Sequence, residues 1–258
     1  MAKKWSKFPH ADKAYVYDEA ALKKSWARLH KGDLEPYPKD AAVREAWRAY
    51  HAGDFQKAVE LGNGAGDAGV NAAIKAQMIY AHYLEGAEKP RLALLEEAAS
   101  WADARRQDAP KDPNAHYYYS YALGRYSQGI SIGTALAQGL VSKVRDAQTA
   151  ALKLAPKHAD AHIAHGSYHA EIVAKVGGLL ASVTYGARKD AAIEHFETAR
   201  KLFPESAIAR IEYANALALL FGKSRQSDST ALLKEASQCK PADAMERLDV
   251  ELARDKLG

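Results

Sequence analysis

The sequence predicts an all-α protein: a right-handed α-solenoid built of helix pairs that carry apolar insertions. After Asp40 there is no sustained alternation of β-branched and polar residues, and the residues that favour helix dominate. Turn signals rich in Gly, Pro and Asp recur at short intervals, which favours antiparallel helices joined by tight turns. Prolines recur at a spacing that suits a repeated helix pair, at Pro110, Pro156, Pro204 and Pro241.

Two earlier helix pairs are expected ahead of the first of these prolines. The segment 46–62, AWRAYHAGDFQKAVELG, predicts one pair with its turn at Gly53. The segment 72–106 predicts another, interrupted at 86–90, where GAEKP breaks the helical pattern. Together with the proline-spaced units, this gives about four or five stacked helix pairs.

The proline-spaced units share a pattern of small and large residues. Successive prolines lie 46, 48 and 37 residues apart. Ala192, Phe196 and Ala199 follow one another at intervals of four and three residues, and a proline stands five residues further on. This is the pattern of the tetratricopeptide repeat, in which small residues let neighbouring helices approach and large ones fill the space between them. The helices that follow the prolines place small residues in matching positions, among them Ala115, Ser120, Ala159, Ala161, Gly166, Ala207 and Ala214.

Residues 110–240 resemble two helical-repeat families, the regulator of microtubule dynamics family and the T component of bacterial TRAP transporters. The resemblance is carried by Gly129-Ile130, Ala147 to Pro156, Ala161-His162 with Gly166, and Ala192 to Pro204. It implies a helical-repeat protein that acts through partners or bound ligands. The sequence differs from the T component in having no apolar run of signal-peptide length near its start and no lipid-attachment cysteine there, so a periplasmic lipoprotein is not expected.

The composition is that of a globular chain, with 258 residues, 48% hydrophobic and 26% charged. The formal charge of +4 is localised, because residues 1–31 carry eight basic and three acidic side chains and the rest of the chain sums to −1. We therefore expect a basic N-terminal arm at 1–35 and a tetratricopeptide-like helical repeat domain at 36–258. Such an arm can touch an acidic surface, a membrane face or RNA, but we favour a solubilising role and expect no nucleic-acid partner.

Sequence motifs for common catalytic sites are largely missing. No GxGxxG follows a predicted strand, and neither GxxxxGK[ST] nor HExxH occurs, so we expect no enzyme and no cofactor. The single cysteine, Cys239, excludes an intrachain disulfide and fits a reducing compartment. The most apolar stretch, 172–183, contains Lys175 and is too short to span a bilayer, so we expect a soluble, cytoplasmic protein.

The repeats of 46 and 48 residues exceed the 34-residue tetratricopeptide period by about 12 to 14 residues. The additional segments read GRYSQGISIGTALAQGL and EIVAKVGGLLASVTYG, which are apolar and carry few charges. Because monomers seldom expose large apolar patches, we expect Gly129–Leu140 and Ile172–Gly186 to be largely buried, against one another or against a second copy of the chain. A homo-oligomer is therefore an open alternative.

Six residues are candidates for a binding wall on the concave inner face. They occupy equivalent positions on the three helices that follow the first three prolines: Tyr117, Tyr121, Ile163, Ser167, Ile211 and Asn215. Tyrosine suits a binding wall because it offers a large contact area with a polar tip, although packing between repeats explains these residues equally well. We expect a non-catalytic interaction module that binds a peptide, a partner protein or an apolar small ligand on this face, with a self-associating scaffold as the alternative.

A stripe of histidines lies in the helix after the second of these prolines: His158, His162, His165 and His169. Spacings of four, three and four residues place them on one helical face, where imidazoles can share a transition metal. His162, His165 and His169 also stand where the repeat packs bulky side chains, and His116 holds the position equivalent to His162 one repeat earlier. We favour the structural role and expect His162 and His165 to be mostly buried, at least one to hydrogen-bond within the protein, and no stoichiometric zinc.

Overall fold

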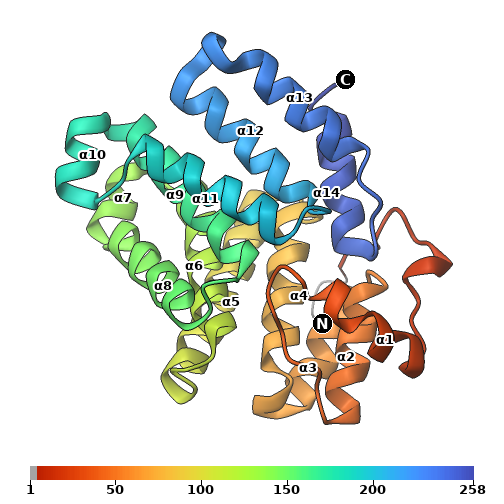
Figure 1. The fold of residues 1–258 in the computed structure, drawn as a ribbon. Helices are drawn as coiled ribbons and strands as arrows, with labels where there is room; N and C mark the ends of the chain where they lie inside the picture. Colours follow the sequence, from red (N-terminus) through yellow and green to blue (C-terminus); the bar gives the residue numbers. More distant parts are fainter. Residues whose placement is uncertain (1–4) are drawn as a thin grey trace. The chain divides into compact units, whose positions relative to one another are not determined.

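The computed structural model describes residues 5–258. Every element of regular secondary structure in this range is a helix and no strand occurs within it, which confirms the expected all-α class (Figure 1). The described chain divides into two compact units. The first unit comprises residues 5–30, 35–154 and 242–245, and the second unit comprises residues 31–34, 155–241 and 246–258.

The first unit is a stack of helix pairs. Its helices are α1 (Glu19–Leu29), α2 (Ala41–His51), α3 (Phe55–Gly64), α4 (Val70–Tyr83), α5 (Glu88–Asp108), α6 (Pro113–Gln128), α7 (Ile132–Ala137) and α8 (Leu140–Leu154). From α2 to α6 each helix packs on the next, and α6 then packs on α8. The first helices of the pairs also touch one another, since α4 contacts both α2 and α6. This is the arrangement that a tetratricopeptide-like repeat predicts.

The second unit repeats this arrangement. Its helices are α9 (Ala159–Val176), α10 (Gly178–Tyr185), α11 (Lys189–Leu202), α12 (Ala207–Phe221), α13 (Gln226–Ser237) and α14 (Ala244–Asp255), the last from residue 246 onward. α9 pairs with α11 and α12 pairs with α13, while α12 also lies along α9. Val250 and Ala253 of α14 close the core formed by Ala207, Ile211 and Ala236.

Three of the expected prolines start a helix in the same way. α6, α9 and α12 each begin shortly after one of them, and the residue two positions beyond the proline is the N-cap. The caps are Asp112, His158 and Ser206, whose side chains accept a backbone N–H of the first helical turn at 3.0–3.2 Å. Such a bond satisfies one of the backbone donors that a helix start leaves unpaired. The proline spacing therefore predicts the helix starts correctly.

A close side-chain contact between α9 and α11 uses the small residue that the repeat pattern predicts. Phe196 of α11 is fully buried and lies over Gly166 of α9, where a Cβ would come within 2.9 Å of the ring. The ring of Phe196 also stacks on Tyr213 of α12, with centroids 5.3 Å apart. Ala192 and Ala199, on the same helix as Phe196, are fully buried as well. Glycine at position 166 is thus required by space and not by backbone conformation.

Replacing Gly166 with Ala is expected to destabilise the protein. Crowding of the Phe196 ring costs about 1–3 kcal/mol, which exceeds the gain of up to about 1 kcal/mol from the better helix former. Gly124→Ala is the matched control, since it lies inside α6 and no atom lies within 4 Å of a Cβ placed there. That variant is expected to gain about 0.5–1 kcal/mol. Urea unfolding followed by circular dichroism measures both, and a shift of the same sign in the two variants contradicts the packing argument.

Aromatic residues of the expected N-terminal arm pack on the first unit. Trp5 stacks on Tyr80 of α4 with ring centroids 4.0 Å apart, and the backbone N–H of Ser6 donates to the Tyr80 hydroxyl at 3.0 Å. Phe8 is buried and meets Phe55 of α3 edge to face. These aromatic residues therefore fasten the start of the described chain to the first helix pairs.

The helix that follows is part of the first unit too. Leu22, Trp26 and Leu29 of α1 are buried, while the intervening Lys23 and Lys24 are exposed. Trp26 meets Trp47 of α2 edge to face at 6.0 Å. The boundary expected at residue 35 stays a prediction, although α1 packs on the helices of the first unit. The apolar residues of α1, spaced four and three positions apart, dock the same helix that carries the basic side chains.

The apolar insertions are helical but mostly exposed. Gly129–Leu140 contains α7, and Ile172–Gly186 contains the end of α9 and all of α10. In the first segment Ala135 and Leu140 are buried, and in the second Ile172, Val173 and Ala181 are. Most of their other described side chains face solvent. The expectation of burial is therefore wrong within the single chain, because an eight-residue helix at the end of a hairpin can bury only one face. Burial against a second copy stays a prediction.

Candidate functional site

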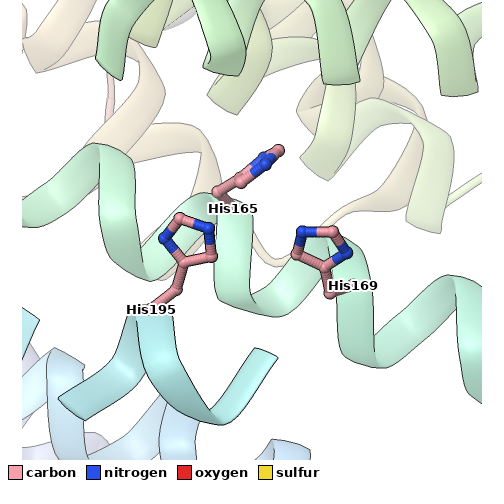
Figure 2. A group of neighbouring side chains, drawn as sticks. All are labelled: His165, His169 and His195. Atoms are coloured by element: carbon pink, nitrogen blue, oxygen red, sulfur yellow. The ribbon is translucent and has the colours of Figure 1, made fainter. Parts of the chain in front are cut away.

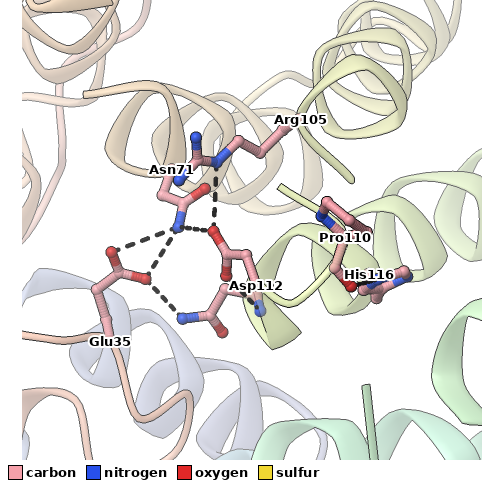
Figure 3. Close-up of polar contacts among 7 residues, drawn as sticks. Glu35, Asn71, Arg105, Pro110, Asp112 and His116 are labelled. Carbon is pink, nitrogen blue, oxygen red and sulfur yellow. Dashed lines mark hydrogen bonds and ion pairs between the residues drawn. The ribbon is translucent and has the colours of Figure 1, made fainter. Parts of the chain in front are cut away.

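A polar cluster in the first unit joins the starts of α4 and α6 to the segment before α2 (Figure 3). Glu35 Oε2 accepts hydrogen bonds from Asn114 Nδ2 at 2.6 Å and from Asn71 Nδ2 at 3.2 Å. Asn71 Nδ2 also donates to Asp112, whose carboxylate accepts from Arg105 Nε at 3.3 Å. Asn71 and Asn114 are buried, so amides replace water around the Glu35 carboxylate. The sequence did not reveal this cluster, because Asn71 and Asn114 lie 36 and 79 residues from Glu35 along the chain.

The face formed by α2 and α4 is covered by the chain itself. Every residue of α4 from Asn71 to Ala81 is buried. Lys75 is only 5% exposed, with its Nζ 5.9 Å and 5.4 Å from the ring centroids of Trp47 and Tyr50 on α2. Cation–π contacts of this kind compensate for part of the lost hydration of a buried ammonium group. The first helices of these two pairs therefore offer no open wall to a partner.

Two candidates for the binding wall, Tyr117 and Tyr121, do lie together on α6. Their rings are 6.1 Å apart; Tyr117 is buried and Tyr121 is half-buried. Tyr121 also meets His82 of α4 edge to face at 6.3 Å, and Arg125 lies 5.4 Å from the Tyr121 ring centroid. Burial lowers the pKa of His82 well below its ordinary value, and the nearby Arg125 and Arg91 lower it further. At the place where a binding wall was expected, the structure has a cluster of aromatic rings with the neutral imidazole of His82 at its edge.

The other four candidates lie in the second unit and do not all face outward. Ile163 is 6% exposed and Ser167 is half-buried on α9. Ile211 is 0% exposed, because α14 packs over it. Asn215 is half-buried, and its side-chain amide donates to Glu212 on its own helix at 3.3 Å. Ile211 is therefore a core residue, which the sequence did not show because its cover comes from a helix about 40 residues further along the chain.

The histidine stripe separates into two roles. His158 is fully buried and caps α9, so it does not share the face of the others. His162 Nε2 lies 3.0 Å from the carbonyl oxygen of Pro156, and His116 Nε2 lies 2.9 Å from that of Pro110 one repeat earlier. The expectation that a stripe histidine hydrogen-bonds within the protein is confirmed. His162 and His165 are half-buried, which is less than expected.

A histidine from a neighbouring helix completes the group. His195 of α11 places its Nδ1 2.8 Å from His162 Nδ1. Its ring centroid lies 4.7 Å from that of His165 and 5.7 Å from that of His169. His165, His169 and His195 each offer one ring nitrogen that could bind a metal ion, and these three nitrogens lie within 4.8 Å of one another (Figure 2). The spacing of histidines along α9 does not include His195, which the pairing of α9 with α11 brings to the group.

These imidazoles are held in their neutral form. Burial is the largest cause, and it lowers the pKa of His165 to about 3 and those of His169 and His195 to about 4. The neighbouring imidazoles lower the pKa values of His165 and His195 further, and Arg188 does the same for His169. All three rings are thus uncharged near neutral pH and keep a lone pair each.

Ser131 lies in a short sequence motif that is typical of catalytic serines. Residues 129–133 read GISIG, which matches the GxSxG pattern of serine hydrolases. That pattern acts at a sharp turn between a strand and a helix. Here Ser131 is the N-cap of α7, and its Oγ accepts the Thr134 N–H at 3.1 Å and lies 2.8 Å from the Thr134 hydroxyl. The match therefore reflects a helix cap.

Comparison with known proteins supports the fold and goes no further. No family model and no curated protein matches the sequence. Among solved structures, the chain is similar to a thermophilic TPR protein from Thermus thermophilus, with a TM-score of 0.58 and 16% sequence identity. The match covers 83% of this chain and 97% of that protein. This likeness supports a tetratricopeptide-type α-solenoid, and the finer resemblance to the two families named above stays a prediction.

Within residues 5–258, no helix combines the length and the apolar character that crossing a bilayer requires.

The neutral state of His82 makes the stability of the protein depend on pH. Its pKa in the folded chain lies well below the ordinary value of 6.5, so the unfolded chain binds the proton more tightly and stability falls as the pH drops below about 6.5. The slope of the unfolding free energy against pH gives the number of protons taken up on unfolding. In His82→Gln, this number is expected to fall by up to about one between pH 7 and pH 5. Urea titrations at several pH values measure the slope.

His116→Gln is the control for this variant, since it removes a histidine from the same unit away from Arg91 and Arg125. A wild-type slope in His82→Gln, or an equal reduction in His116→Gln, contradicts the role assigned to His82.

Proposed function

We propose that this chain is a non-catalytic interaction module of the helical-repeat kind, and that it binds a protein partner through α10. The observation that carries the proposal is the exposure of three aliphatic side chains on one short helix. Leu179, Val183 and Leu180 are 83%, 79% and 52% exposed. Spacings of one and four residues gather them on one side of α10, opposite the buried Ala181.

The chain forms this helix in a way that keeps it exposed. Gly177 and Gly186 bracket α10 with φ angles of +80° and +67°, a backbone region that favours glycine. These two positions let the chain turn away from α9 and return to α11 (Figure 1). Contiguous apolar side chains at such a place are typical of a protein–protein contact. An apolar helix laid into a groove of the partner is the recognition mode that fits best.

The concave face has less support as the place where a peptide, a protein or an apolar ligand binds. The α2–α4 face is occupied by the chain's own N-terminal residues, and Ile211 belongs to a core. Tyr117 and Tyr121 in the first unit stay candidates for a further contact, and so, separately, do Ile163, Ser167 and Asn215 in the second unit. The α10 surface takes precedence because its side chains are already exposed.

A second copy of the chain is the other candidate occupant, and the same exposed side chains favour it. Three aliphatic residues present far less than the roughly 800 Å² per partner of a stable interface, so α10 meeting α10 alone gives a weak dimer. A groove that surrounds the helix covers more of it. We therefore favour a different protein as the partner.

Photo-crosslinking from α10 tests the proposal. A benzophenone amino acid at the exposed Ser182 is expected to give an adduct of defined mass with a second protein in the source cells, and the same group at Glu194 on α11 is not. Adding Leu179→Asp and Val183→Asp is expected to abolish the adduct, whereas Lys201→Ala leaves it unchanged. An adduct of twice the chain's own mass favours self-association, and equal adducts with and without the aspartates contradict an apolar contact.

The same double substitution gives a stability prediction. Because Leu179 and Val183 make few contacts within the chain, Leu179→Asp with Val183→Asp is expected to shift the free energy of unfolding by no more than about 0.5 kcal/mol per substitution. Val173→Asp is the comparison, since that buried residue of α9 stands before the same turn. Thermal unfolding of the purified chain measures both. A large loss in the α10 variant shows that its apolar face is packed in solution.

A further inference from the structure

We propose that His165, His169 and His195 form a binding site for one divalent transition-metal ion, with Zn²⁺ as the ion to test first. Their donor nitrogens lie within 4.8 Å of one another, and they come from two packed helices. The sequence predicted no stoichiometric zinc, and that expectation took into account only the histidines of α9. The inference is independent of the partner proposed for α10.

The geometry needs only a small contraction to hold an ion. Zinc–imidazole bonds are about 2.0–2.1 Å long in a tetrahedral arrangement, which places the ligand nitrogens about 3.3 Å apart. His165 and His169 stand one turn apart on α9, a spacing that lets two imidazoles share a metal. In Figure 2 the rings of His169 and His195 turn one nitrogen each toward the other, with His165 beside them. Closing the remaining distance requires rotation about the side-chain bonds of these histidines.

The hydrogen bonds behind His195 set it up as a ligand. The Pro156 carbonyl can only accept, so neutral His162 carries its proton on Nε2 and keeps a lone pair on Nδ1. His195 then donates its Nδ1–H to that lone pair at 2.8 Å, which leaves the lone pair of its own Nε2 available. Histidines that bind metals usually donate their other ring N–H in this way, which fixes the ring and raises its basicity. His162 is thus a positioning residue.

His169 requires one rearrangement. The backbone N–H of Arg188 donates to His169 Nδ1 at 3.2 Å, so the neutral ring holds its proton on Nε2, the other ring nitrogen. Binding a metal through Nε2 moves that proton to Nδ1 and gives up the bond from Arg188, which weakens binding by about 10-fold at most. Arg188 is an exposed residue in the short turn between α10 and α11.

The chemistry of the group favours a borderline ion. Three neutral imidazoles suit Zn²⁺, Cu²⁺ or Ni²⁺ and are poor ligands for Mg²⁺ or Ca²⁺, which prefer oxygen. The low pKa values of the three rings mean that few protons must leave before a metal binds. His169 is buried, whereas His165 and His195 are half-buried, so a fourth ligand from solvent can reach an ion past these two rings.

Titration of the metal-stripped full-length protein with Zn²⁺, followed by calorimetry, tests the proposal. The wild type is expected to bind one Zn²⁺ per chain and to unfold at a higher temperature with it, since the ion binds the folded state. His195→Ala is expected to weaken binding at least about 100-fold, and His162→Ala about 10–100-fold as a positioning residue. His116→Ala, which removes the carbonyl-bonded histidine outside the cluster, is expected to leave the affinity unchanged.

X-ray absorption at the zinc edge keeps the test independent of how the variants fold. In the wild type it is expected to show about three imidazoles at 2.0–2.1 Å. Fewer than three imidazoles, no one-to-one binding, or an affinity that His195→Ala leaves unchanged overturns the three-histidine site.

Discussion

The close approach of α9 and α11 is the contact on which the second unit depends. A Cβ at Gly166 would lie within 2.9 Å of the Phe196 ring, and Phe196 in turn stacks on Tyr213 of α12. One missing side chain therefore lets three helices share a single aromatic residue. The same approach brings His195, the residue before Phe196, beside the histidines of α9. The contact between α9 and α11, which the repeat pattern predicts, thus determines both the packing of the second unit and the position of the candidate metal ligands.

The sequence predicted the features that depend on local spacing. Prolines marked the starts of α6, α9 and α12, and small residues at fixed intervals marked the helix contacts. It failed where the deciding partner lies far along the chain. Glu35 meets Asn114 across 79 residues, His162 meets His195 across 33, and α14 covers Ile211. A search along one helix cannot find such partners.

The N-terminal residues combine charge with apolar anchoring. Eight basic side chains predicted an arm, and within it Phe8, Trp26 and Leu29 are buried while Lys23 and Lys24 of α1 are exposed. The insertions differ from expectation within the single chain. Apolar composition predicted burial for Leu179 and Val183, yet both are exposed on α10, which lies between two glycines of positive φ. We therefore propose the partner contact on α10 and the metal site on the paired helices α9 and α11.

The protonation pattern of the histidine rings tests the central claim, that the α9–α11 contact aims His195 Nε2 at His165 and His169. Long-range proton–nitrogen correlation spectra of the metal-free protein report which ring nitrogen carries the proton. The account predicts a proton on Nε2 of His162 and on Nδ1 of His195, with a free lone pair on His195 Nε2. A His195 ring protonated on Nε2, or rings that exchange freely between both forms, would contradict it.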